Sequence, residues 1–139
     1  MANASRFGSM PVSVLTGEQI VRVGGDATLY EVADIMAGAG VGALVLGDGD
    51  PPTGIVTERD FVSALATRRD PAATRAEDLA QTTLVWCAAD ATVSEVAELM
   101  MEKYVRHVLV EDEGKLVGIV SARDLLGAYA AEDTDDEEQ

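Results

Sequence analysis

The feature that most constrains this chain is an internal repeat, in which the sequence matches itself after a shift of 64 residues. Residues 54–60 read GIVTERD, and residues 118–124 read GIVSARD. With the same shift, residues 12–62 align on residues 76–126 without a gap, and DATLYEVADIM falls on DATVSEVAELM. A match of this extent indicates two copies of one supersecondary unit.

A capping-box pattern marks the first predicted helix of each copy. Thr28 is followed three residues later by Glu31, and Thr92 by Glu95, so each pair can satisfy helix N-terminal N–H groups reciprocally. Apolar residues then recur with helical spacing: Leu29, Val32, Ala33 and Met36 in the first copy, and Val93, Val96, Ala97 and Met100 in the second. Each copy therefore predicts an amphipathic helix at this point.

The rest of each copy predicts strands, a hairpin and a second helix. A short apolar run precedes the first helix, and two further runs follow it, joined by the turn-rich segments DGDPP and DEGK. The second helix is predicted for ERDFVSALATRR and ARDLLGAYAAE, and within each copy a lead-in segment, VSVLT or AEDLA, precedes these elements. The predicted order of elements is β-α-β-β-α in both copies.

One such unit is too small to bury both faces of its sheet, so two units should share a core. We predict an α+β fold with two repeats packed by pseudo-twofold symmetry, which would give two equivalent crevices. The predicted ranges are a lead-in at 1–11, a first domain at 12–69, a second domain with its linker at 70–131, and a disordered acidic tail at 132–139.

Composition excludes several classes of function. The formal net charge is −15, which argues against nucleic acid as the main partner. Cys87 is the only cysteine, so the chain has no intrachain disulfide, and a reducing compartment is favoured. The first ten residues lack the apolar run of a signal peptide, and no apolar stretch approaches the roughly 20 residues that span a bilayer. We therefore expect a cytoplasmic protein that does not insert into a membrane.

The repeated GIV[TS]xRD motif has two physical interpretations. Its hydroxyl residue stands where a strand turns into a helix, and an aspartate follows three residues later: Thr57 with Asp60, and Ser121 with Asp124. The pair can simply cap the helix. Alternatively, the carboxylate can accept two hydrogen bonds from the vicinal diol of a ribose, with a phosphate near the helix N–H groups. Spacing alone favours the cap, and both interpretations remain open.

The order of these motifs resembles the tandem CBS-domain pair, also called a Bateman module, from Val12 to about Ala130. The resemblance implies two domains that form an intramolecular pair with clefts for adenosyl ligands. It implies that Asp60 and Asp124 bind ribose hydroxyls with Thr57 and Ser121 beside them. It also implies that first-strand residues flank the adenine: Ile20, Val21, Val23, Leu84, Val85 and Cys87.

The two copies differ beside this motif. Arg106 and His107 stand where the first copy has Gly42 and Ala43. In the family, basic residues at this place often reach phosphates, and arginine makes strong charge-assisted hydrogen bonds. We therefore expect unequal clefts, of which one favours a phosphorylated ligand. An arginine also precedes the aspartate in both copies, where a phosphate contact and a solvated ion pair are equally compatible with the sequence: Arg59 and Arg123.

Taken together, the sequence predicts a regulatory or sensor module that is not an enzyme. Its expected ligand is AMP, ADP, ATP or S-adenosylmethionine, and its expected partners are a second copy and an unidentified regulated protein. No cofactor or metal is expected, since one His and one Cys cannot build a His/Cys metal site. The alternatives are a structural or adaptor dimer with degenerate, empty clefts, and a hydrolase or redox protein that uses Cys87 or His107.

Overall fold

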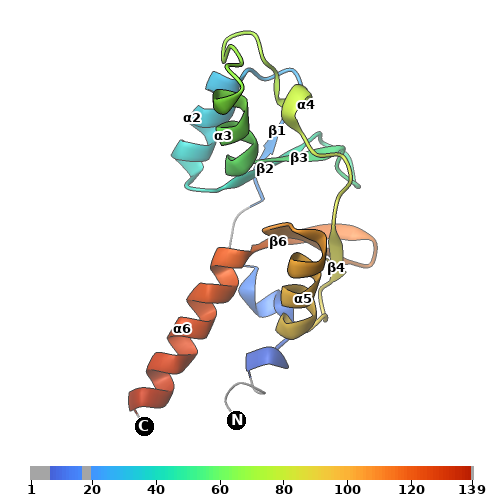
Figure 1. The fold of residues 1–139 in the computed structure, drawn as a ribbon. Coiled ribbons are helices and arrows are strands. Elements are labelled where there is room, and N and C mark those ends of the chain that lie inside the picture. The colour runs from blue at the N-terminus through green and yellow to red at the C-terminus, as the bar shows by residue number, and fades with distance from the viewer. Residues whose placement is uncertain (1–6, 17–19, 139) are drawn as a thin grey trace. The chain divides into compact units, whose positions relative to one another are not determined.

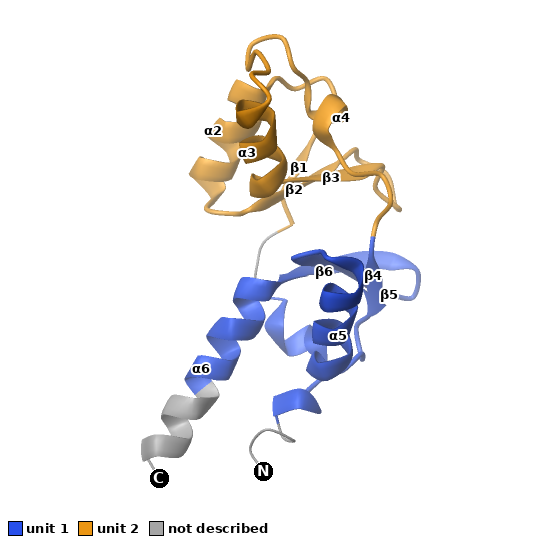
Figure 2. Cartoon of the chain, viewed as in Figure 1, with its two compact units in different colours: residues 1–18, 85–139 blue, residues 19–84 orange. Residues whose placement is uncertain are grey.

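The structure is a computed structural model that describes residues 7–16 and 20–138. The chain divides into two compact units (Figure 2). Unit 1 contains residues 1–18 and 85–139, and unit 2 contains residues 19–84. Each unit has one three-stranded sheet with helices, which confirms the predicted α+β class and the predicted repeat.

Unit 2 holds the β-α-β-β-α elements of the first copy (Figure 1). They are β1 (Arg22–Val23), α2 (Leu29–Ala39), β2 (Ala43–Leu46), β3 (Gly54–Thr57) and α3 (Glu58–Ala66), followed by α4 (Ala76–Leu79). The sheet order is β1-β2-β3, with β1 parallel and β3 antiparallel to β2. The predicted hairpin of the first copy is therefore confirmed.

Unit 1 repeats this arrangement with the second copy. Its elements are the 3-10 helix η1 (Val12–Leu15), β4 (Trp86–Ala88), α5 (Val93–Lys103), β5 (His107–Asp112), β6 (Lys115–Ser121) and α6 (Ala122–Glu138). The sheet order is β4-β5-β6, again with one parallel and one antiparallel neighbour for the central strand. The two units thus share one topology, as the repeat predicts.

Both predicted capping boxes form. The Thr28 hydroxyl accepts the N–H of Glu31 while the Glu31 carboxylate accepts the N–H of Thr28, and the same reciprocal pair starts α5. Because the Glu95 carboxylate accepts the backbone N–H and then the hydroxyl of Thr92, its pKa lies below the ordinary value despite a small opposing effect of desolvation. Helix starts are therefore set by local sequence.

Aliphatic side chains fill the core of each unit. Burial of one Val or Leu side chain contributes roughly 1.5–3 kcal/mol, so these clusters supply most of the driving force for folding. In unit 2 the cluster contains Val23, Val32, Met36, Leu44, Leu46, Val56 and Ala76. In unit 1 it contains Val12, Val96, Met100, Val108, Val110 and Val120.

Each lead-in segment packs in the unit of the other copy. Val12 of η1 is fully buried in unit 1, where its N–H donates to the carbonyl oxygen of Ala91 at 2.7 Å. Ala76 of α4 is fully buried in unit 2, where its N–H donates to the carbonyl oxygen of Ala27 at the same distance, 2.7 Å. The two copies of the sequence have therefore exchanged their lead-ins.

The glycine that opens each GIV motif makes room for the exchanged segment. A Cβ on Gly118 would lie 2.8 Å from the Cβ of Thr16, which directly follows η1. A Cβ on Gly54 would lie 3.2 Å from the Cβ of Ala80 and 3.1 Å from the carbonyl oxygen of Gln81. Glycine at these strand positions thus permits close backbone approach.

The compact units differ in membership from the ranges that the repeat predicts. The ranges 12–69 and 70–131 describe copies of sequence, whereas the units place residues 12–16 with the second copy and residues 76–84 with the first. The helix α6 runs from Ala122 to Glu138.

Candidate functional site

The Thr57–Asp60 motif of unit 2 forms a capping box at the start of α3. Asp60 Oδ2 accepts the N–H of Thr57 at 2.9 Å and its hydroxyl at 3.1 Å. In return, the N–H of Asp60 donates to Thr57 Oγ1 at 3.4 Å. The capping interpretation of the motif is therefore realised in the first copy, and it engages one oxygen of the carboxylate.

The other oxygen of this carboxylate also has a partner. Gln81 donates from Nε2 to Asp60 Oδ1 at 3.0 Å. The backbone of Gln81 is fixed beside β3, because its N–H and carbonyl oxygen exchange hydrogen bonds with Ile55 at 2.9 and 3.0 Å. Asp60 thus carries a hydrogen-bond donor on each oxygen.

The Ser121–Asp124 motif of unit 1 forms the same cap at the start of α6. Asp124 Oδ2 accepts the N–H of Ser121 at 2.8 Å, and the N–H of Asp124 donates to the Ser121 hydroxyl at 3.0 Å. Ser121 is buried, with 5% of its surface exposed, while Asp124 is half-buried. Among the described residues, no donor contacts Asp124 Oδ1.

Arg106 and His107 lie beside this second motif. His107 is the cross-strand partner of Ser121 in the β5–β6 ladder, so the two side chains stand on the same face of the sheet. The carbonyl oxygen of Arg106 accepts the N–H of Ala122, the first residue of α6, at 2.8 Å. The structure therefore brings Arg106, His107, Ser121 and Asp124 to one end of the unit 1 sheet.

The corresponding place in unit 2 carries a carboxylate. Glu58, the first residue of α3, donates its N–H to the carbonyl oxygen of Gly42 at 3.0 Å, and its side chain lies against Gly42. A Cβ on Gly42 would lie 3.2 Å from Glu58 Cδ. Sequence reasoning missed Glu58. The sequence did contain a signal, because two positions differ together between the copies. Gly42 and Glu58 in the first copy correspond to Arg106 and Ala122 in the second.

The arginines of the two motifs and the first-strand residues have different surroundings. Arg59 and Arg123 are exposed on the first turns of their helices. Val23 is 8% exposed and belongs to the core of unit 2. The remaining predicted first-strand positions are half-buried: Ile20, Val21, Leu84, Val85 and Cys87.

The contacts of the first-strand backbone repeat between the units. The carbonyl oxygen of Val21 accepts the N–H of Val45, and that of Val85 accepts the N–H of Leu109, both at 2.9 Å. Leu84 is the last residue of unit 2, so Leu84 and Val85 fall in different units.

Cys87 does not form a nucleophilic pair with His107. In the parallel β4–β5 ladder Cys87 stands opposite Val110, three residues from His107, which corresponds to about 10 Å along a strand. Burial, followed by the nearby charge of Glu111, raises the pKa of Cys87 to about 11. The side chain is therefore a neutral thiol near pH 7 and a weak nucleophile.

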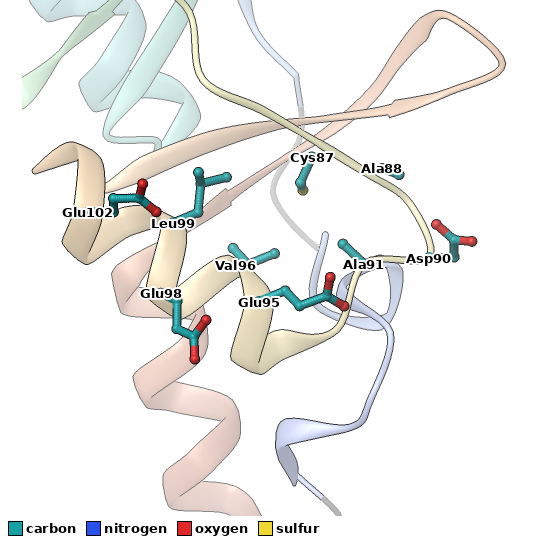
Figure 3. A pocket seen from close by; sticks show the side chains of 9 residues that line it. All are labelled: Cys87, Ala88, Asp90, Ala91, Glu95, Val96, Glu98, Leu99 and Glu102. Carbon is teal, nitrogen blue, oxygen red and sulfur yellow. The ribbon is translucent and has the colours of Figure 1, made fainter.

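Unit 1 also contains an acidic pocket of about 640 Å³ on the side of α5 (Figure 3). Its lining residues are Cys87, Ala88, Asp90, Ala91, Glu95, Val96, Glu98, Leu99 and Glu102. The four carboxylates make this pocket unsuitable for a phosphate. Of the predicted site residues, only Cys87 lines it.

Metal-binding clusters and membrane-spanning helices are both absent from the described part of the chain. No group of three or more His, Cys, Asp or Glu side chains there is arranged to hold a metal ion. Within residues 7–16 and 20–138, none of the helices has the length and apolar character needed to cross a membrane.

Comparison with known proteins identifies the repeat. The family model described as "CBS domain" matches residues 12–67 and 76–131. Hypoxic response protein 1 of Mycobacterium tuberculosis is 38% identical over 105 residues, which cover 74% of this chain and 73% of that protein. An uncharacterized protein of Methanopyrus kandleri is 31% identical over 121 residues, which cover 85% of this chain and 62% of that protein. The chain thus spans less than two thirds of the Methanopyrus protein.

A solved structure shows the same fold with a ligand. The CBS domain protein of Pyrobaculum aerophilum, complexed with AMP, superposes with a TM-score of 0.74 at 31% sequence identity. The match covers 88% of this chain and 99% of that chain.

Proposed function

This chain belongs to the CBS-domain family, and we propose that it is a regulatory module that binds an adenosyl ligand through its two [TS]xxD motifs. The observation that carries the proposal is the state of Asp124. One oxygen of its carboxylate caps α6, and the other has no donor among the described residues. The cap orients the carboxylate. One side chain can therefore stabilise the helix start and also accept a hydrogen bond from a hydroxyl group of a ligand.

Ribose is the chemical group that suits this acceptor. Its vicinal hydroxyls are donors, and an ionised carboxylate accepts hydrogen bonds only. Hydrogen bonds to a charged acceptor are stronger than neutral ones, and a vicinal diol supplies two donors from one bound molecule. The AMP complex of the Pyrobaculum protein, at 31% identity, supports adenosyl compounds as the first ligands to test.

A phosphorylated ligand suits the second motif better than the first. The positive charge of Arg106 and the helix dipole at the start of α6 favour an anion. At the start of α3, Glu58 opposes one. We therefore propose that Ser121, Arg123, Asp124, Arg106 and His107 form the phosphate-facing site, and that AMP, ADP and ATP bind there in preference to the first motif.

Signalling would follow from a population shift. A ligand changes a conformational equilibrium only by its difference in affinity for the two states. A ligand that binds one conformation of the module more tightly than another would raise the population of that conformation, and a regulated protein would recognise it. No step requires bond chemistry, and the raised pKa of Cys87 argues against a thiolate enzyme. We place the module in the cytoplasm, where adenine nucleotides are abundant.

A second candidate, the structural dimer, is favoured by exposed apolar positions that repeat between the copies. Val62 and Leu65 of α3 are 65% and 49% exposed, and their counterparts on α6, Leu126 and Tyr129, are 70% and 55% exposed. Equivalent apolar positions on both second helices favour a homodimer. Sedimentation of the single variants Val62→Glu and Leu126→Glu tests this, with an expected fall from dimer to monomer mass.

Ligand-dependent thermal unfolding separates the sensor from the purely structural dimer. A ligand at about 100 times its Kd stabilises the folded state by about 2.7 kcal/mol, which corresponds to roughly 5–10 °C for a domain of this size. AMP, ADP, ATP and S-adenosylmethionine should be tested on the wild type and on Asp124→Asn. Asp34→Asn, an exposed position on α2, is the matched control. An unchanged melting temperature with all four compounds would exclude the sensor function.

A further inference from the structure

We propose that Gln81 is a specificity-determining residue that occupies the Thr57–Asp60 motif from within the chain. The first motif would then bind a nucleoside diol more weakly than the Ser121–Asp124 motif. This inference rests on the proposed function, because an internal occupant matters only where the motif is a ligand site. It goes beyond that function because it names the side chain that gives the two motifs different affinities for the ribose diol.

The carboxylate of Asp60 has a hydrogen-bond donor on each of its oxygens. Oδ2 accepts the N–H and the hydroxyl of Thr57, and Oδ1 accepts Gln81 Nε2 at 3.0 Å. The amide therefore takes the place that a ribose hydroxyl would take. A diol that binds Asp60 must displace the amide or share Oδ1 with it, and either choice lowers affinity.

The fold holds the amide in this place. Gln81 exchanges two backbone hydrogen bonds with Ile55, two residues before Thr57, which fixes the base of its side chain along β3. Gly54 permits this approach, since a Cβ there would lie 3.1 Å from the Gln81 carbonyl oxygen. The side chain of Gln81 is solvent-exposed, but the packing of the exchanged lead-in fixes the position of its backbone.

The second copy has no glutamine at the corresponding sequence position. The sequence position that corresponds to Gln81, 64 residues earlier, is Gly17, which has no side-chain amide. Consistent with this, Asp124 Oδ1 has no donor within the described part of the chain. Both caps share the reciprocal backbone bonds, and in the first copy Oδ2 also accepts the hydroxyl of Thr57. Within the described residues, the difference at Oδ1 comes from Gln81.

Glu58 adds a separate effect that depends on charge. Its carboxylate lies against Gly42 at the start of α3, where the second copy has Ala122 and Arg106. It should oppose a phosphate and leave a neutral nucleoside unaffected. The two residues thus have different signatures, since Gln81 should act on adenosine and AMP alike, whereas Glu58 should act on AMP alone.

The experiment measures adenosine and AMP binding to the first motif by NMR titration. The background is the full chain with Asp124→Asn, which weakens the second motif and keeps a capping oxygen. In this background Gln81→Ala should raise the affinity for both ligands about three- to tenfold. This is the effect expected from one hydrogen bond to an exposed charged group. Thr82→Ala, at the exposed neighbouring position, is the matched control and should change neither.

Two further variants complete the design. Glu58→Ala, which installs the residue of the second copy, should tighten AMP but not adenosine, and added salt should reduce the gain. Asp60→Asn combined with Gln81→Ala should remove the gain from Gln81→Ala. This last result would assign the gain to the first motif.

The outcomes separate this inference from the function on which it rests. Suppose that the wild type binds AMP, but Gln81→Ala changes the affinity of the first motif by less than about twofold or lowers it. Gln81 is then not an occupant, and the inference is overturned while the proposed function stands. If neither the wild type nor any variant binds either ligand, the proposed function fails and this inference fails with it. A gain for both ligands that needs Asp60 supports the inference.

Discussion

The carbonyl oxygen of Arg106 accepts the N–H of Ala122 at 2.8 Å, and this bond joins the start of β5 to the start of α6. It holds a cationic residue beside a helix N-terminus, where the helix dipole already favours anions. The same bond in unit 2 joins Gly42 to Glu58 and places a carboxylate there. Besides the capping aspartate that both share, the two helix starts therefore differ in the residue joined by this bond: cationic Arg106 in unit 1 and acidic Glu58 in unit 2.

Removal of the Arg106 guanidinium should weaken phosphorylated ligands selectively. We expect Arg106→Ala to reduce AMP affinity about tenfold, which is the loss of one charge-assisted hydrogen bond, and to change adenosine affinity less than about twofold. Calorimetric titration of both ligands provides the measurement. Lys115→Ala removes the same charge at the other end of β6 and should leave AMP binding unchanged. Equal losses for AMP and adenosine would contradict a phosphate contact.

Substitution of Asp124 should separate its structural role from its binding role. Asn retains an oxygen that can accept the N–H of Ser121, whereas Ala leaves that group without its partner. We expect Asp124→Ala to lower the free energy of unfolding by about 1 kcal/mol and Asp124→Asn to cost less than half of that. Both variants should lose nucleotide affinity. Urea unfolding without ligand, followed by titration, tests the two roles separately. If Asp124→Asn bound nucleotides with the affinity of the wild type, the carboxylate of Asp124 would not be part of the binding site.

Gly118 should be intolerant of even one added methyl group. Gly118→Ala places a Cβ 2.8 Å from Thr16 Cβ, and such overpacking costs about 1–3 kcal/mol. Gly127, on α6, has open space where a Cβ would stand, with nothing within 4 Å, so Gly127→Ala should stabilise by about 0.5–1 kcal/mol through helix propensity. Urea midpoints give both values. The double variant Thr16→Gly with Gly118→Ala should recover part of the loss, and strict additivity would rule out their contact.

The thiol of Cys87 should make stability depend on alkaline pH. Its pKa rises from the ordinary 9.0 to about 11 in the folded state, so the folded state retains a proton that the unfolded state loses first. The contribution is fully present below pH 9 and disappears as the pH rises through about 11. Unfolding measured from about pH 8 to 11 should therefore show a steeper decline for the wild type than for Cys87→Ala. Parallel curves would refute the shifted pKa.

Much of the fold follows from the sequence, because local signals agree with the global arrangement. The capping boxes at Thr28 and Thr92 both form, and the residues that recur with helical spacing after them are largely buried. The turn-rich segments DGDPP and DEGK do join antiparallel strands. These features depend on neighbours within a few residues, which a single sequence displays directly.

The exchange of lead-ins could not be predicted from the repeat. A repeat reports that two segments are alike, but η1 and α4 could each pack on either copy with the same apolar pattern. Only the contacts of Val12 with Ala91 and of Ala76 with Ala27 decide the choice.

Sequence reasoning missed two residues of the candidate site for a similar reason. Gln81 reaches Asp60 across 21 positions, and its role depends on the backbone pairing with Ile55. Glu58 looked like an ordinary first-turn acid, and its contact with Gly42 appears only in three dimensions. The placement of Arg106 and His107 beside Ser121 was within reach, because the hairpin register brings them together.

The exchanged lead-ins also imply an order of assembly during synthesis. Unit 2 is one continuous stretch, residues 19–84, so all of it is available once the ribosome has passed its end. Unit 1 is made from segments on both sides of that stretch, and η1 lacks β5 and β6 until the second copy has been made. Since domains fold as units from the N-terminal side during translation, η1 emerges before unit 2 and should find its place after it. We therefore expect the side chain of Val12 to stay exposed to solvent until unit 2 has folded and the second copy has been made.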